Sequence, residues 1–377
     1  MAVRNPFQYS GIVGGESFCN REQEKRDLLR AMENREKLFV YSERRLGKTS
    51  LVKTVLQHLP RSYAAAYVDL WPTDGESTFV TALAKAIAES MTRSGTRLLK
   101  LAKDLFSTLS PSLTVDESGL PSLTLGVRDK DVQPALEEVL ATPGRIHAQG
   151  KRRPVVVFDE FQRIAEYDND LVERRLRSVV QHQSEVAYLF LGSRRHTIQA
   201  MFLDSDRPLY RSAGHYPLGP ISASHWQPFI RRKFRAGEKR ISGERIEEIC
   251  SLTQGHPFYT QHLCHLLWEH CEPDTAVTSE QISAAVQLLL DREGFAYTTL
   301  WESLTNNQRR FLKGLSLEPK RIEPFAGAFV RRYGLRSASN AQRAAEALLK
   351  RDLLDRDNGS FIFLDRFFRL WVRRLQT

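Results

Sequence analysis

Short apolar runs alternate with amphipathic stretches along the first half of the chain, which is the pattern of alternating strands and helices. The apolar runs predict strands at 37–41, 64–70, 154–158 and 186–191. Between them, apolar residues at helical spacing predict helices at 21–34, 50–58, 79–90 and 132–149. Strands separated by helices of this length build a parallel sheet. We therefore expect an α/β fold whose ligands bind at the carboxyl ends of the strands.

Three departures from this pattern divide the chain. Residues 107–131 are rich in Ser, Pro, Gly and Thr, and alternating runs flank a turn cluster, which predicts a β-hairpin insertion. From about 221 the pattern is helical only. After 300 it predicts three helices and a hairpin with a tight turn at 357–360, the order of a winged helix. We expect an α/β core over 1–220, a helical domain over 221–300 and a winged-helix domain over 301–377.

The composition is that of a globular protein. The chain has 377 residues, 41% of them hydrophobic and 27% charged, and this length favours two or three domains. No stretch approaches the ~20 apolar residues that cross a bilayer, and the start has no apolar signal-peptide core. The four cysteines are scattered and form no Cys-x-x-Cys pair. We expect a cytoplasmic protein and exclude secreted, membrane-spanning and zinc-finger classes.

The positive charge lies mainly in the last fifth of the chain. The net charge is +10, and residues 302–377 carry 16 Lys and Arg against 8 Asp and Glu. A basic domain favours binding to a polyanion, because neutralised phosphates release counterions. The alternative is a solvated basic face without a ligand.

The strongest candidate site is the run Ser-Glu-Arg-Arg-Leu-Gly-Lys-Thr at 42–49, between a predicted strand and a predicted helix. It has the form of a phosphate-binding loop, with Ser42 where glycine is usual. Gly47 lets backbone N–H groups approach phosphate, Lys48 supplies charge and Thr49 can ligate Mg²⁺. The candidate ATP-binding residues here are Arg44, Arg45, Leu46, Gly47, Lys48, Thr49 and Ser50. The alternative is a chance match at a helix start.

Two acids close the apolar strand at 154–158. Asp159 and Glu160 would lie at the ligand-binding edge of the sheet. We expect Asp159 to hold the Mg²⁺ that Thr49 ligates, through a water molecule, and Glu160 to polarise the attacking water in ATP hydrolysis. The alternative is a surface acid pair without a catalytic role.

The strand at 186–191 ends in a further polar cluster. Ser193 is a candidate sensor of the γ-phosphate, and Arg194 or Arg195 a candidate to pair with it. Arg211 is a weaker candidate for an arginine finger supplied to a neighbouring subunit. The alternative is that these arginines lie on the surface.

Taken together, these motifs make the chain resemble the archaeal-type P-loop ATPases of the STAND branch of the AAA+ superfamily. The resemblance covers essentially the whole chain. The matching residues lie at 5–7 (NPF), 18–22 (FCNRE) with Glu24, 44–51 (RRLGKTSL), 158–162 (FDEFQ), 192–193 (GS) and 255–259 (GHPFY).

The resemblance implies an AAA+-like sheet core and a helical lid over 221–300. It also implies that Phe18 and Arg21 lie near the adenine, although Asn20 stands where the family motif usually has glycine. The turn with His256 and Pro257 would approach the nucleotide from the lid. From residue chemistry alone, His256 is a lone turn histidine with a structural role.

In a winged helix the start of the third helix enters the major groove of DNA. The candidate DNA-contacting residues there are Ser339, Asn340, Gln342 and Arg343. The alternative is that the winged helix packs against the ATPase or binds a protein partner.

These observations favour an ATP-driven switch that hydrolyses ATP slowly. A nucleotide-dependent homo-oligomer is an open part of this hypothesis. Two alternatives stay open. One is a DNA-binding AAA+ regulator or loader. The other is a nucleotide-gated scaffold that binds ATP without turning it over, as in a defence or toxin system.

Overall fold

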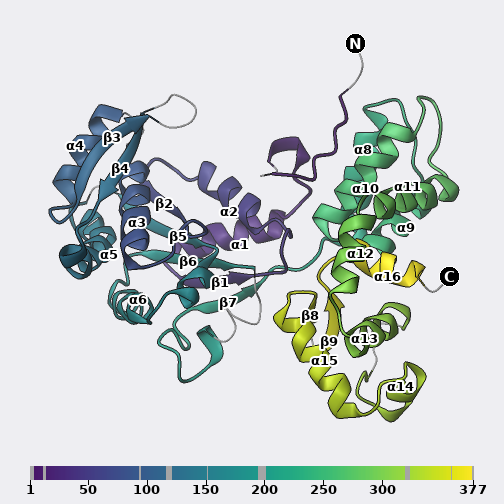
Figure 1. Ribbon diagram of the computed structural model, residues 1–377. Helices are drawn as coiled ribbons and strands as arrows, with labels where there is room; N and C mark the ends of the chain where they lie inside the picture. The colour runs from purple at the N-terminus through teal and green to yellow at the C-terminus, as the bar shows by residue number, and fades with distance from the viewer. Residues whose placement is uncertain are drawn as a thin grey trace. The chain divides into compact units, whose positions relative to one another are not determined.

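A computed structural model gives the structure of the protein and describes residues 4–11, 14–92, 95–115, 121–150, 152–193, 201–318, 323–357 and 359–375. Its contacts divide the chain into two compact units. The first is Arg21–Gly219, and the second is Met1–Asn20 together with Pro220–Thr377. In Figure 1 the first unit carries the central sheet, and the second carries a group of helices with a small hairpin.

The first unit is built on a five-stranded parallel sheet in the order β2-β5-β6-β1-β7 (Figure 1). Its strands are β1 (Lys37–Tyr41), β2 (Tyr63–Asp69), β5 (Arg153–Asp159), β6 (Ala187–Gly192) and β7 (Gly214–Pro217). β6 lies between β1 and β5, so the loops that follow these three strands meet at one edge of the sheet. The predicted parallel α/β core is confirmed, while the short edge strand β7 was not predicted.

Helices cover both faces of this sheet. Alternate residues of each strand point to opposite faces, so both sets of side chains are buried. Val156 and Phe158 of β5 are buried in one cluster with Phe79 and Leu136. The ring of Phe158 stacks on those of Phe79 and Phe190, with both centroid distances at 5.8 Å. The helices of this unit are α1 (Glu22–Glu33), α2 (Lys48–Gln57), α3 (Glu76–Met91), α4 (Gly95–Leu105), α5 (Val132–Ala148) and α6 (Leu171–His182), with the 3₁₀ turns η2 (Asp129–Asp131) and η3 (Phe161–Glu166).

The segment in which we expected a hairpin forms β3 (Ser110–Val115) and β4 (Pro121–Gly126), which pair antiparallel. The sequence pattern did not predict α4, which precedes them. Leu123 and Leu125 of β4 are buried in the same cluster as Leu98 and Ala102 of α4. The hairpin is therefore packed onto the core rather than projecting without contacts.

The helical part of the second unit begins just after the sheet. Its helices are α8 (Ala223–Arg235), α9 (Gly243–Thr253), α10 (Pro257–His270), α11 (Ser279–Arg292) and α12 (Gly294–Glu302). The N-terminal segment, with the 3₁₀ turn η1 (Gly15–Ser17), packs on these helices. Lys233 Nζ donates to the Pro6 carbonyl at 2.6 Å, and the Phe7 ring lies 5.5 Å from that of Phe234.

The C-terminal part has the element order of a winged helix. It contains α13 (Asn306–Leu317), α14 (Gly327–Arg332), α15 (Ala338–Lys350), the antiparallel pair β8 (Leu354–Asp357) and β9 (Ser360–Phe363), and α16 (Arg366–Arg374). Ser337 caps α15, since its Oγ accepts from the Asn340 N–H at 3.2 Å. α14 begins at Gly327, because residues 324–325 form a turn and Ala326 is the N-cap.

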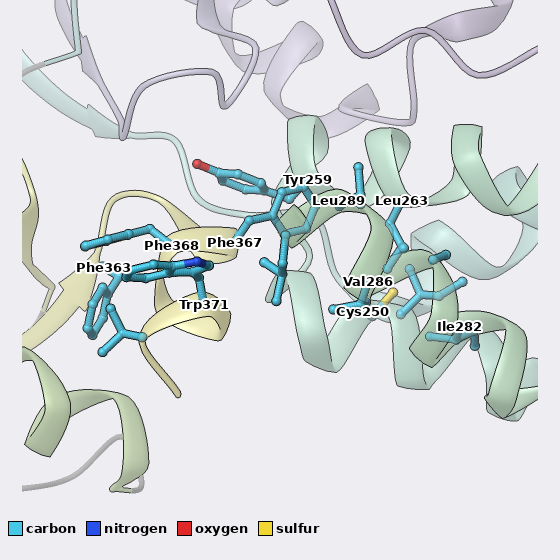
Figure 2. Close-up of a cluster of buried hydrophobic side chains, with 14 of the residues drawn as sticks. Cys250, Tyr259, Leu263, Ile282, Val286, Leu289, Phe363, Phe367, Phe368 and Trp371 are labelled. Carbon is cyan, nitrogen blue, oxygen red and sulfur yellow. The ribbon is translucent and has the colours of Figure 1, made fainter. Parts of the chain in front are cut away.

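One hydrophobic core runs through both parts of the second unit. Figure 2 shows Phe367, Phe368 and Trp371 of α16 close to Phe363, with Tyr259 of α10 on their other side. The rings of Tyr259 and Phe367 meet edge to face with centroids 4.9 Å apart. The aromatic run of α16 is therefore core, and it joins the winged helix to the helical part. No helix in the described ranges combines the length and the apolar content needed to cross a membrane.

Replacing Phe368 by Ala tests this shared core. Phe368 stacks on Trp371 (5.9 Å between centroids) and is almost completely buried. We expect Phe368→Ala to lower the free energy of unfolding by about 3–5 kcal/mol, through lost burial and a residual cavity. Denaturant unfolding of the full chain measures it. Phe295→Ala is the matched control, since Phe295 is 86% exposed, and an equal loss in both variants would contradict the assignment.

Candidate phosphate-binding site

The loop between β1 and α2 has the local geometry of a phosphate-binding turn. Gly47, the N-cap of α2, has φ 89° and ψ 21°, a left-handed conformation that glycine adopts without strain. α2 begins at Lys48, so the N–H groups of its first turn face the loop. Arg45 also has a positive φ, of 60°. Left-handed residues in a loop are typical of anion-binding nests, in which successive backbone N–H groups face the anion.

Ser42 takes the position where such loops usually have glycine. Its φ is not positive, so this backbone does not require glycine. The Ser42 side chain is buried, donates to the Glu43 carbonyl at 2.7 Å and accepts from Lys48 Nζ at 3.1 Å. The serine therefore holds the Lys48 ammonium in the loop. Lys48 is only 5% exposed.

Thr49 and Asp159 are brought together although 110 residues separate them. Thr49 Oγ1 donates to Asp159 Oδ2 at 2.6 Å, and Tyr67 Oη donates to the same oxygen. Because the threonine proton points to Asp159, its oxygen lone pairs stay available for a metal. Burial, then the charge of Asp159, raise the pKa of the Tyr67 phenol, which keeps it a donor. The hydroxyl, the carboxylate and a nearby phosphate site are oxygen ligands of the kind Mg²⁺ takes.

Glu160 is held in a left-handed conformation, with φ 52° and ψ 41°, directly after β5. Its Oε2 accepts from Ser193 Oγ at 2.9 Å and from Gln162 Nε2. A non-glycine residue with positive φ is strained and needs surrounding contacts to hold it. The structure thus brings Glu160 and Ser193 together, and adds Gln162, which is almost fully buried.

Arg21, which begins the first unit, donates hydrogen bonds within that unit. Its Nη2 donates to the carbonyls of Gly219 (2.7 Å) and Leu46 (3.4 Å), and Nη1 pairs with Glu24 at 2.7 Å. The residue is 5% exposed. Its guanidinium therefore links the phosphate-binding loop to Gly219, where the chain leaves the unit.

The other arginine candidates are placed differently. Arg44 and Arg45 of the loop are exposed, and so is Arg211, which has φ 50° and lies over the Tyr210 ring. Arg194 and Arg195 lie outside the described residues. Ser50 is buried in the first turn of α2.

Phe18, His256 and Pro257 belong to the second unit. His256 is the buried N-cap of α10, with Pro257 as the first helical residue. The preceding Gly255 has φ 66°, and a side chain there would collide with the Ile221 carbonyl. This turn is rigidly built within its own unit.

The candidate DNA-contacting residues lie at the start of α15. Ser339, Gln342 and Arg343 are exposed, and Arg343 Nη2 donates to Asn340 Oδ1 at 2.7 Å. The four side chains share one helix terminus of the winged helix.

Sequence reasoning missed Tyr67 and Gln162. Tyr67 lies on the strand that follows α2, and only the pairing of β2 with β5 brings it to Asp159. Gln162 follows Glu160 by two residues, and that local signal could have identified it. In both cases the side chain supports an acid rather than matching a motif of its own.

Comparisons with known proteins agree with this architecture. Residues 18–263 match the model of a family described as an ATPase domain predominantly from Archaea, and residues 295–374 match a probable winged helix domain. No curated protein matches the chain.

Two solved structures are similar over almost the whole chain. A Walker-type ATPase of Pyrococcus abyssi aligns with TM-score 0.64 and 17% identity, covering 98% of this chain and 99% of its own. The ORC2 protein of Aeropyrum pernix, solved in ADPNP–ADP complexes, aligns with TM-score 0.56 and 13% identity, covering 99% of this chain and 98% of its own.

The fold is that of a P-loop ATPase with an AAA+-like core and a C-terminal winged helix. The chain belongs to the archaeal-type ATPase family, since that family's model spans 18–263 of its 377 residues.

Arg21→Gln tests the link between the loop and Gly219. The shorter, neutral side chain leaves two backbone carbonyls and Glu24 without a charged donor, so we expect the unfolding free energy to fall by about 2–3 kcal/mol. Arg30→Gln, at an exposed position of α1, should change it by less than about 0.5 kcal/mol. Urea unfolding measures both, and equal midpoints would contradict a structural role for Arg21.

Proposed function

We propose that the protein is a nucleotide-driven switch. It binds ATP with Mg²⁺, hydrolyses ATP slowly, and transmits its nucleotide state through a helical lid (221–300) and a winged helix (301–377) to a partner. Its membership of the STAND branch rests on the resemblance of its motifs and is part of this proposal.

The observation that carries the proposal is the position of Arg21. The first unit starts at Arg21 and ends at Gly219, so both chain connections to the second unit lie at these residues. The same guanidinium contacts the carbonyls of Gly219 and of Leu46 in the loop. A phosphate that reorders the loop would therefore act on the residue that holds both connections. This is the differential contact that a switch needs between its two nucleotide states.

The loop residues would divide the binding of ATP among them. Lys48 would contact the β- and γ-phosphates, with backbone N–H groups of the loop and of the first turn of α2 around them. Thr49 and Asp159 would hold Mg²⁺, which neutralises charge developing on the phosphates. The hydrogen bond from Thr49 to Asp159 keeps both groups in this arrangement before a nucleotide arrives.

Glu160 would activate the attacking water. Both of the hydrogen bonds that its carboxylate receives in the described part of the chain are made to Oε2. Ser193 and Gln162 would fix the orientation of the carboxylate, and Oε1, which accepts no hydrogen bond from the described residues, would take a proton from water. Ser193 would sense the γ-phosphate beside it, with Arg194 as the proposed cationic partner.

Glu160→Gln tests hydrolysis. The amide keeps the shape of the side chain but accepts no proton, so we expect ATP to bind with unchanged affinity and multiple-turnover phosphate release to fall at least about a hundredfold. Lys48→Ala should instead lose measurable ATP binding, because the loop then lacks its central charge.

Equal phosphate release by the wild-type protein and Glu160→Gln would refute the catalytic assignment. Tight ATP binding by the wild-type protein without multiple turnover would favour the nucleotide-gated scaffold instead.

A second candidate function is that of a DNA-binding AAA+ regulator or loader. It is favoured by the charge of residues 302–377, with 16 basic against 8 acidic residues, and by the exposed Gln342 and Arg343 at the start of α15. In this version double-stranded DNA is the partner and homo-oligomers form on it, with Arg211 as a finger for the neighbouring subunit.

Duplex binding at several salt concentrations tests this candidate. Arg343→Gln should weaken binding and reduce the slope of log affinity against log salt by about one, as expected for one lost phosphate contact. Lys100→Gln, at an exposed position of α4 in the first unit, is the charge-matched control. Fluorescence anisotropy of a labelled duplex reads the affinity, and an unchanged slope for Arg343→Gln would exclude this residue from the interface.

A further inference from the structure

Tyr67 is placed on β2 so that its hydroxyl reaches the acid at the end of β5. The two strands pair in parallel, with Tyr67 opposite Val157 and Asp69 opposite Asp159. Side chains two residues apart on a strand leave the same face of the sheet. Tyr67 and Asp159 therefore point to the same side, and Tyr67 Oη donates to Asp159 Oδ2.

The Asp159 carboxylate is held at both oxygens. Oδ2 accepts from Thr49 Oγ1 at 2.6 Å as well as from Tyr67, and Oδ1 accepts from the Glu160 N–H at 2.9 Å. Asp159 is 3% exposed, so water contributes little to its solvation. Three protein donors thus fix the plane of a buried anion.

The Tyr67 ring is itself anchored from the phosphate-loop helix. Lys53 Nζ stands over the ring, 4.5 Å from its centroid. Lys53 follows Thr49 by one turn of α2, so the same helix face supplies Thr49 to Asp159 and Lys53 to the tyrosine. The Tyr67 side chain of β2 is thus contacted by Lys53 of α2 and by Asp159 of β5.

We propose that Tyr67 is a positioning residue for the metal site. It holds the Asp159 carboxylate in the orientation in which this acid and Thr49 receive Mg²⁺ together with the nucleotide. The inference rests on the proposed function. Partners that orient a metal-binding group in this way set metal affinity, and their loss commonly weakens it by about tenfold or more.

In this role Tyr67 does not contact the nucleotide. Its hydroxyl donates to Asp159, and Lys48 and the loop would bind the phosphates. Removing the hydroxyl should therefore change the response to Mg²⁺ and leave metal-independent binding of the nucleotide intact. That separation distinguishes a positioning role from a packing role.

The experiment compares the wild-type protein, Tyr67→Phe and Tyr63→Phe. Tyr63 lies on the same strand, and its hydroxyl accepts from Arg153 Nη1 at 3.4 Å rather than reaching Asp159. Fluorescent N-methylanthraniloyl-ADP is first titrated into each protein in EDTA. Mg²⁺ in excess of the EDTA is then titrated into each complex at a fixed concentration of the same probe. The readout is binding, so it does not depend on turnover.

We expect Tyr67→Phe to bind the ADP probe in EDTA with the wild-type affinity and to need about tenfold more Mg²⁺ for the half-maximal change. Tyr63→Phe should match the wild type in both titrations. An unchanged Mg²⁺ midpoint in Tyr67→Phe overturns the inference, and so does an equal loss of affinity with and without Mg²⁺. Absence of binding to the wild-type protein would overturn the proposed function itself.

Discussion

The hydrogen bond from Thr49 Oγ1 to Asp159 Oδ2 joins the start of α2 to the end of β5 across 110 residues of sequence. β6 lies between β1 and β5 and all three strands run in the same direction, so the residues that follow β1 and β5 meet at one edge of the sheet. The apolar runs that bury these strands on both faces are therefore what places a hydroxyl, a carboxylate and an ammonium at one edge. The chemistry of the candidate site depends on the sheet more than on any loop.

Three residues of the candidate site have strained backbone. Glu160 and Arg45 have positive φ without being glycine, and Arg21 has φ 79° at the start of the first unit. Each such residue costs of order 1–3 kcal/mol and needs fixed surroundings. Glu160 obtains them from Ser193 and Gln162, and Arg21 from two carbonyls and Glu24. The free energy gained by burying the sheet offsets the cost of this strain at the candidate phosphate-binding site.

The sequence was most informative where the signal is local. Strands buried on both faces leave continuous apolar runs, so β1, β2, β5 and β6 could be predicted, whereas β7 is four residues long with Gly, His, Tyr and Pro and leaves no such run. The candidate phosphate loop and the two acids are contiguous motifs, so the sequence alone could single them out as candidates. The role of Tyr67 could not be predicted, because it depends on which strand lies beside β2. No single segment of the sequence determines the strand order.

Calorimetric titration of ATP into the unaltered protein, with Mg²⁺ and then with EDTA, tests the central claim most directly. The account predicts saturable binding of one nucleotide per chain that is tighter when Mg²⁺ is present. Absence of binding up to millimolar ATP, or an affinity that ignores Mg²⁺, would contradict it.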